Sequence, residues 1–155
     1  MTLLDPTPVK PEKSRVMAFT VAAVTVAVIV ILWLAFRYYP EKKVAERFFT
    51  ALAAGNTDLA YQLWKPTPSY SMKDFLADWG PDGYYGPVKS YEILKTCAPH
   101  ASNTVDVSVA VSPFSPMPQA GDDEKSRKTK VVSIWVITSD KSLSFPPGPV
   151  SCHFL

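Results

Sequence analysis

The chain has 155 residues with a formal net charge of +2 at pH 7, and 47% of them are hydrophobic. From Pro40 onward acidic and basic side chains balance one another, so the excess charge belongs to the residues before it. Nucleic-acid binding needs a basic stripe or patch, and this composition therefore argues against nucleic acid as a partner. The residues after Pro40 are enough for one domain with its own core.

Residues 1–15 are expected to form an extended tail. Prolines 6, 8 and 11 alternate there with acidic and basic side chains. Such a segment cannot bury enough apolar surface to fold alone.

Residues 16–36 contain no charge and no proline. A helix over this stretch covers roughly 31 Å, the thickness of a hydrocarbon core. In lipid the backbone must satisfy its own hydrogen bonds, so a single spanning segment has to be helical. We predict a transmembrane helix over residues 16–37 that is retained in the lipid bilayer. A buried core helix is the alternative, and the run is too long for the apolar region of a cleaved signal peptide.

Small side chains gather in the first half of this stretch. Ala18, Ala22 and Thr25 follow at four- and three-residue spacing and would share one helix face. Helices associate in lipid through close approach at small residues, so the strip is predicted to pack against a neighbouring helix. The alternative is that small residues are simply common in membrane helices.

The side of the membrane is predicted less directly. Lysines and arginines flank both ends of the apolar stretch, so the positive-inside rule does not discriminate. A short N-terminal tail and a pair of cysteines favour an N-in orientation. The domain would then lie outside the cytoplasm, anchored in a bacterial inner membrane.

Three helices are predicted between residues 40 and 80. Pro40 opens the first, Asn56 or Thr57 caps the second, and Ser69 or Ser71 caps the third. Their apolar residues recur at helical spacing: Val44, Ala45, Phe48, Phe49, Leu52, Ala53, then Leu59, Ala60, Leu63, Trp64, then Phe75, Leu76, Trp79.

From Gly86 the apolar period changes to two. Strands are predicted over residues 88–97, 104–112 and 130–138, and a hairpin turn over residues 139–142 leads to a last strand interrupted by prolines. Asp106 alternates with valines and is therefore expected on a solvated face. Helices followed by an antiparallel four-stranded meander define an α+β fold.

Two segments carry a resemblance to a known family. V-A-E-R-F-F-T-A-L-A-A-G-N-T-D-L-A-Y-Q-L-W and G-P-V-K-S-Y-E-I-L, followed by two long strands, resemble the nuclear-transport-factor-2-like superfamily. The resemblance covers residues 41–154 and implies a cone, in which a bent sheet of four strands wraps the first of about three helices. It is greatest to small bacterial members behind a single membrane helix, and the domain is assigned to residues 40–155. The superfamily includes both enzymes and binding modules.

Enzymes of this superfamily place Asp, His, Tyr or Arg in the mouth of the cone. Here the inward strand positions hold Val, Ile, Trp and Tyr. We therefore predict no catalytic residue and no cofactor. Four aromatic residues are candidate pocket-lining side chains, with ordinary core packing as the alternative: Tyr84, Tyr85, Tyr91 and Trp135.

Cys97 and Cys152 are the two cysteines of the chain. A disulfide between them would contribute about 4 kcal/mol in the chain-entropy model, and two free buried thiols are the alternative. A zinc site with His100 and His153 is a weaker reading, because the adjacent Cys152 and His153 would point to opposite faces of a strand.

These features together predict a function. The chain is expected to be a non-catalytic, single-pass accessory subunit of a larger membrane complex, such as a photosynthetic or respiratory one. Its extramembrane domain would then contact other membrane subunits. The alternative is a free-standing anchored domain that binds a small apolar ligand or performs simple acid–base chemistry.

Overall fold

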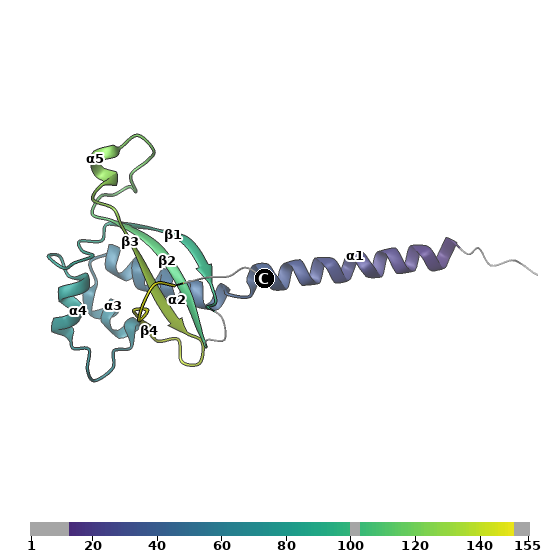
Figure 1. Cartoon of the computed structure of the whole chain (residues 1–155), viewed down its shortest axis with the longest axis horizontal. Coiled ribbons are helices and arrows are strands. Elements are labelled where there is room, and N and C mark those ends of the chain that lie inside the picture. Colours follow the sequence, from purple (N-terminus) through teal and green to yellow (C-terminus); the bar gives the residue numbers. More distant parts are fainter. Residues whose placement is uncertain (1–12, 100–102, 151–155) are drawn as a thin grey trace, which may run out of the picture. The chain divides into compact units, whose positions relative to one another are not determined.

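The computed structural model describes residues 13–99 and 103–150, with side chains from residue 17 onward. The chain divides into two compact units, one ending at Arg37 and the other beginning at Tyr38. The elements follow in the order α1 (Lys13–Phe36), α2 (Tyr39–Ala53), α3 (Thr57–Trp64), α4 (Met72–Trp79), β1 (Ser90–Cys97), β2 (Thr104–Ser112), α5 (Asp123–Ser126), β3 (Lys130–Ile137) and β4 (Leu143–Ser144) (Figure 1).

Helix α1 makes up nearly all of the described part of the first unit. It has 24 residues, and its apolar side chains are exposed all round. By length and composition it could cross a membrane. At its end the Arg37 guanidinium lies 5.3 Å from the centre of the Trp33 ring, a pairing that suits a membrane–water interface.

The three helices of the second unit begin where their capping residues predict. Pro40 lies in the first turn of α2, and the Asn56 side chain accepts the backbone N–H of Leu59 at the start of α3. Ser71 and Asp74 form a reciprocal capping box at the start of α4. Between α2 and α3 the chain reverses at Gly55, whose φ of +73° favours glycine. The predicted helices and their caps are confirmed.

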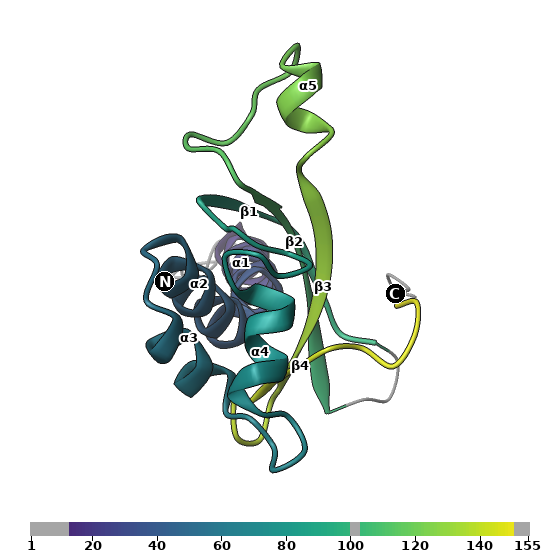
Figure 2. The same ribbon diagram turned by 90° about the vertical axis from the view of Figure 1, so that its left-hand side faces the viewer.

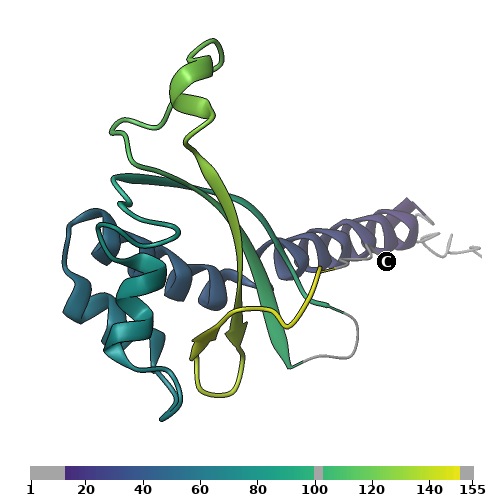
Figure 3. The same ribbon diagram turned by 60° about the vertical axis from the view of Figure 1, so that its left-hand side comes forward.

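The strands form one antiparallel sheet in the order β1-β2-β3-β4. Its twist is visible in Figure 3. The sheet differs from the predicted strands in two details. A register shift between Ile93 and Lys95 leaves Leu94 52% exposed on the edge strand, and β4 is only two residues long. The proline run that follows β4 explains its shortness, because proline cannot donate to a ladder. An α+β fold with a four-stranded antiparallel sheet is thus confirmed.

Helices α2, α3 and α4 lie on one face of the sheet (Figure 2). Alternate residues of the two central strands point toward them and are buried, as the period of two predicts: Val105, Val107, Val109, Val111, Val132, Ile134 and Val136. Phe48 and Phe49 of α2 meet this valine surface and are fully buried.

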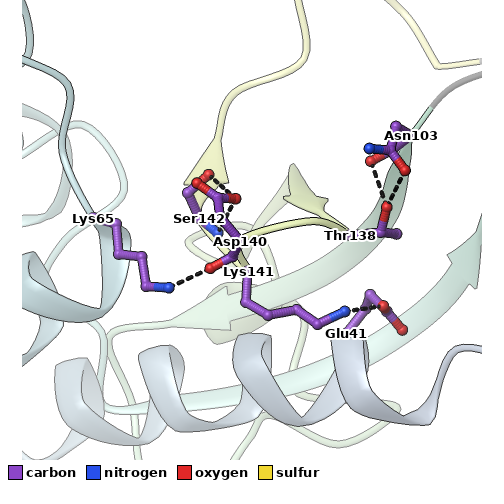
Figure 4. A network of polar contacts seen from close by, with 7 residues as sticks. All are labelled: Glu41, Lys65, Asn103, Thr138, Asp140, Lys141 and Ser142. Carbon is purple, nitrogen blue, oxygen red and sulfur yellow. Dashed lines mark hydrogen bonds and ion pairs between the residues drawn. The ribbon is translucent and has the colours of Figure 1, made fainter.

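A polar network fixes the turn between β3 and β4 to the helices (Figure 4). The Lys141 ammonium lies 2.5 Å from a carboxylate oxygen of Glu41, and the Glu41 side chain is 7% exposed. The Lys65 ammonium donates to the carbonyl of Asp140, whose carboxylate accepts the Ser142 hydroxyl and backbone N–H. The predicted turn over residues 139–142 is confirmed, and it is bound to α2 and to the end of α3.

Candidate functional site

Aromatic rings fill the space between the helices and the sheet. The Phe48 ring lies 5.0 to 5.2 Å from the rings of Phe49, Trp64 and Trp79, and 6.2 Å from that of Phe75. Edge-to-face and offset contacts at such distances stabilise aromatic pairs beyond their area burial. The interior of the domain is therefore a packed core.

Tyr84 and Tyr85 lie at one border of this core. Tyr85 is half-buried and stacks on Trp79 with a centroid distance of 4.9 Å. Tyr84 is 66% exposed, contacts Tyr85 edge-on, and has the Lys130 ammonium 4.5 Å above its ring. The structure brings this predicted pair together as a stacked extension of the core.

Tyr91 and Trp135 lie apart from that pair and from each other. Tyr91 is on the helix side of the sheet, where it stacks on Phe49 at 5.5 Å and shares a 2.8 Å hydrogen bond with the Thr50 hydroxyl. Trp135 pairs with Asp106 across β2 and β3 and lies on the opposite face. The four predicted aromatic residues are thus distributed over three places.

Asp106 is buried, at 3% exposure, and our expectation of a solvated carboxylate was wrong. Its direct cross-strand neighbours, Cys97 and Trp135, shelter it on the face of the sheet away from the helices. One carboxylate oxygen accepts the Ser133 hydroxyl at 3.4 Å, whereas the other is buried and has no hydrogen-bond partner within the described residues. Burial raises the pKa of Asp106, and the Ser133 bond and the charge of Lys95 oppose that rise.

One further titratable pair borders the aromatic core. The Tyr70 hydroxyl donates to a carboxylate oxygen of Asp78 at 2.6 Å. Burial first, and then this bond to Asp78, raise the pKa of Tyr70 well above its ordinary range. The phenol therefore stays neutral and does not act as a base. Its hydrogen bond joins the segment just before α4 to the last turn of that helix.

Cys97 ends β1 and is buried, and its sulfur is bonded in a disulfide. Cys152 lies outside the described residues, so the Cys97–Cys152 pairing remains a prediction. His100 and His153 also lie outside that part of the chain. Within residues 13–99 and 103–150 no group of three or more His, Cys, Asp or Glu side chains could hold a metal ion.

A groove runs along the side of α2, between α3 and the edge strand β1, and encloses a volume of about 770 Å³. On α2 it follows one stripe at helical spacing, over roughly 16 Å from its first to its last residue at about 1.5 Å per residue. The lining side chains are Lys43, Glu46, Arg47, Thr50, Ala51 and Ala54 of α2 and its C-cap, Asn56, Leu59 and Leu63 of the following helix, and Tyr91.

The two ends of the groove differ in character. At the start of α2, Lys43 binds Glu46 at 2.6 Å, and the bond to Glu46 raises the pKa of Lys43. Arg47 is exposed, and its side chain makes no ion pair or hydrogen bond with the described part of the chain. Toward the other end the walls are apolar except for Asn56, and Leu59 is 43% exposed there. The arrangement can accommodate an elongated group with an anionic end and an apolar body.

The sequence reading missed this groove. It named Leu59, Ala60, Leu63 and Trp64 together as the apolar residues of α3. Of these four, only Ala60 and Trp64 are buried, and Leu59 is exposed. The available signal was the spread of apolar residues over more than one face of α3, opposite a stripe of small residues on α2.

The predicted packing strip belongs to the other unit. Ala18, Ala22 and Thr25 are all in α1, and their spacing puts them on one face of that helix. The Thr25 hydroxyl donates to the carbonyl of Val21 at 2.9 Å, so it presents its methyl group rather than an unsatisfied donor.

Comparison with known proteins gives no match. No protein-family model, no curated protein and no solved structure matches the chain. The functional argument therefore depends on the geometry of these residues alone.

Proposed function

We propose that the chain is a non-catalytic, single-pass accessory subunit of a larger membrane protein complex. Its helix α1 would anchor it in the bilayer, and its domain would contact neighbouring subunits. The observation that supports this proposal is the aromatic packing of the domain interior, where the rings of Phe48, Trp64 and Trp79 lie 5.2 to 5.8 Å from one another. Contacts with other molecules would then be made by the surface of the domain.

The proposed fold and location follow the same reasoning. Helices on one face of a twisted antiparallel sheet are compatible with a nuclear-transport-factor-2-like cone closed by aromatic residues. The length and apolar character of α1 support a membrane span. The bonded sulfur of Cys97 favours an oxidising compartment, and with it an extracytoplasmic domain and an N-in orientation in a bacterial inner membrane.

The anchor itself offers the sharpest test. Leucine in place of Ala22 would hold a neighbouring helix away from the strip that Ala22 shares with Ala18 and Thr25. The variant Ala22→Leu should therefore co-purify with fewer partner proteins after mild detergent extraction from native membranes. The variant Ile29→Leu conserves volume in the bulky half of α1 and serves as the matched control.

Two outcomes would contradict the proposal. If the native chain is extracted as a lone species, it has no stable partner subunit. If it has partners but Ala22→Leu and Ile29→Leu retain them equally, the anchor is only a tether and the domain makes the specific contacts.

A second candidate function is supported by the groove. A free-standing anchored domain that binds a small apolar ligand would need an apolar concavity, and the surface formed by Ala54, Leu59 and Leu63 provides one. Extraction as a lone species that carries a bound apolar molecule would favour this candidate over the subunit.

A further inference from the structure

We infer that the groove along α2 binds an acidic phospholipid, with its phosphate at Arg47 and Lys43 and one acyl chain over Ala54, Leu59 and Leu63. This inference uses only one part of the proposed function, namely that α1 is anchored in a bilayer. It needs no partner protein.

The first argument is the division of the groove into a charged end and an apolar end. Arg47 is a planar donor well suited to bind a phosphate, and it has no partner within the described residues. Lys43 adds a second cation, although Glu46 offsets part of its charge. Two cations and one carboxylate leave this end of the groove with an excess positive charge, which a phosphate group would neutralise.

The second argument is the apolar body of the groove. Its far end is formed by small and aliphatic side chains and by Asn56, whose side-chain oxygen accepts the Leu59 backbone N–H, so most of the path alongside α2 is apolar. The hydroxyl pair of Thr50 and Tyr91 is satisfied internally by its 2.8 Å bond. These two hydroxyls therefore do not need a polar group of the ligand as a hydrogen-bond partner. One hydrocarbon chain fits such a path better than a peptide, whose backbone groups would need hydrogen-bond partners.

The third argument is covalent connectivity. Only Arg37 and Tyr38 separate α1 from α2, and the cationic end of the groove lies in the first three turns of α2. With at most about 3.6 Å per residue across the link and about 1.5 Å per residue within α2, Lys43 is at most roughly 17 Å from the end of α1. If α1 spans the bilayer, the phosphates of its surface are the nearest abundant anions. Cations at this distance attract acidic headgroups, and phosphatidylcholine, with no net charge, would not be favoured.

The test uses the full chain in mixed micelles that contain dioleoyl phosphatidylglycerol or dioleoyl phosphatidylcholine, with retained lipids counted by native mass spectrometry. We expect phosphatidylglycerol to be retained in preference to phosphatidylcholine. Arg47→Gln should reduce that retention about fivefold, the factor that corresponds to one cation near a membrane surface. Lys42→Gln is the matched control, because Lys42 is an exposed cation of the same helix outside the groove.

A second pair of variants tests the apolar end. Ala54→Trp should fill the groove and displace the acyl chain, whereas Ala77→Trp puts the same side chain on an exposed position of α4 and should retain lipid as the native chain does. Thermal unfolding of each variant verifies that the domain is folded. The paired design separates loss of the groove from loss of the fold.

Three results would overturn the inference. Equal retention of the two lipids would remove the role of charge, and native-like retention by Arg47→Gln and Ala54→Trp would place the lipid elsewhere. If the same variants instead lose a co-purifying protein, the groove is a protein-docking surface. Flotation with vesicles separates this inference from the proposed function: a chain that does not float is not anchored, whereas a floating chain without lipid preference contradicts only the lipid site.

Discussion

Replacement of Asp106 by asparagine should stabilise the domain at neutral pH. The carboxylate is 3% exposed, one of its oxygens has no partner within the described residues, and the other accepts a single 3.4 Å hydrogen bond. A buried polar group without a partner costs about 1–3 kcal/mol, and more when it is charged. Lys95 and Ser133 offset part of that cost, and the asparagine amide still lacks an ideal partner. We therefore expect a net gain of about 1 kcal/mol, or roughly 3–6 °C in Tm.

The pH dependence of the Tm is a second test of whether Asp106→Asn stabilises the domain. Burial raises the folded-state pKa of Asp106 above its ordinary value of 3.8. Below pH 3.8 the carboxyl is protonated in both the folded and the unfolded state, so ionisation of Asp106 does not destabilise the native protein there. As the pH rises through the folded-state pKa, the buried carboxyl must ionise, and the free energy of unfolding of the native protein falls. Asp106→Asn should thus exceed the native chain most at neutral pH, and the difference should shrink toward pH 4.

The assay is thermal unfolding of the full chain in detergent, followed by near-ultraviolet circular dichroism between pH 4 and pH 8. Asp82→Asn is the control, because Asp82 is an exposed carboxylate in a turn and its replacement should leave the Tm unchanged. The reasoning would be refuted if Asp106→Asn were less stable than the native chain at neutral pH, or if its advantage did not change with pH.

Three further predictions concern the core, the ion pair and the disulfide. Phe48 is fully buried among four aromatic rings, so Phe48→Ala should lower the free energy of unfolding by about 3–5 kcal/mol. Urea denaturation measures this change, and a loss below about 1 kcal/mol would mean that the core is loosely packed. Lys141→Ala should cost roughly 1–3 kcal/mol by leaving the buried Glu41 carboxylate unpaired. Lys43→Ala, which breaks an exposed pair, should destabilise the domain less than Lys141→Ala does. Alkylation without reductant should leave Cys97 and Cys152 unmodified, and quantitative labelling of both would contradict the predicted disulfide and weaken the extracytoplasmic assignment.

The sequence was sufficient for those features that depend on local chemistry. Asn56 and Ser71 start helices because their side chains accept backbone N–H groups, a property that each residue carries into any fold. The strand over residues 104–112 followed from alternating valines, and the structure has it with the same bounds. The coarse α+β class follows from the order of such elements.

Features that depend on neighbours from other segments could not be predicted in this way. Asp106 has the alternation of a solvated residue, and only its pairing with Cys97 and Trp135 shows that it is covered. The short helix α5 lies in a charged loop whose composition does not distinguish a helical turn from an irregular tip. The groove required knowledge of how α3 sits beside α2, because the exposure of Leu59 is a property of that packing and not of the α3 sequence.

The ion pair between Glu41 and Lys141 also has a consequence for the order in which the domain can be completed during synthesis. Its two residues are 100 positions apart, and the aromatic contact of Trp64 with Phe145 spans nearly as much of the chain. Helix α2 is the first element of the domain to leave the ribosome, yet the part of its contacts that comes from β3 and from Lys141 forms only after these later residues have been made. Contacts so distant in sequence make folding slow and expose apolar surface meanwhile. A chain interrupted before Phe145 should therefore be a target for proteases and chaperones, and the domain should close only after Phe145 has been made.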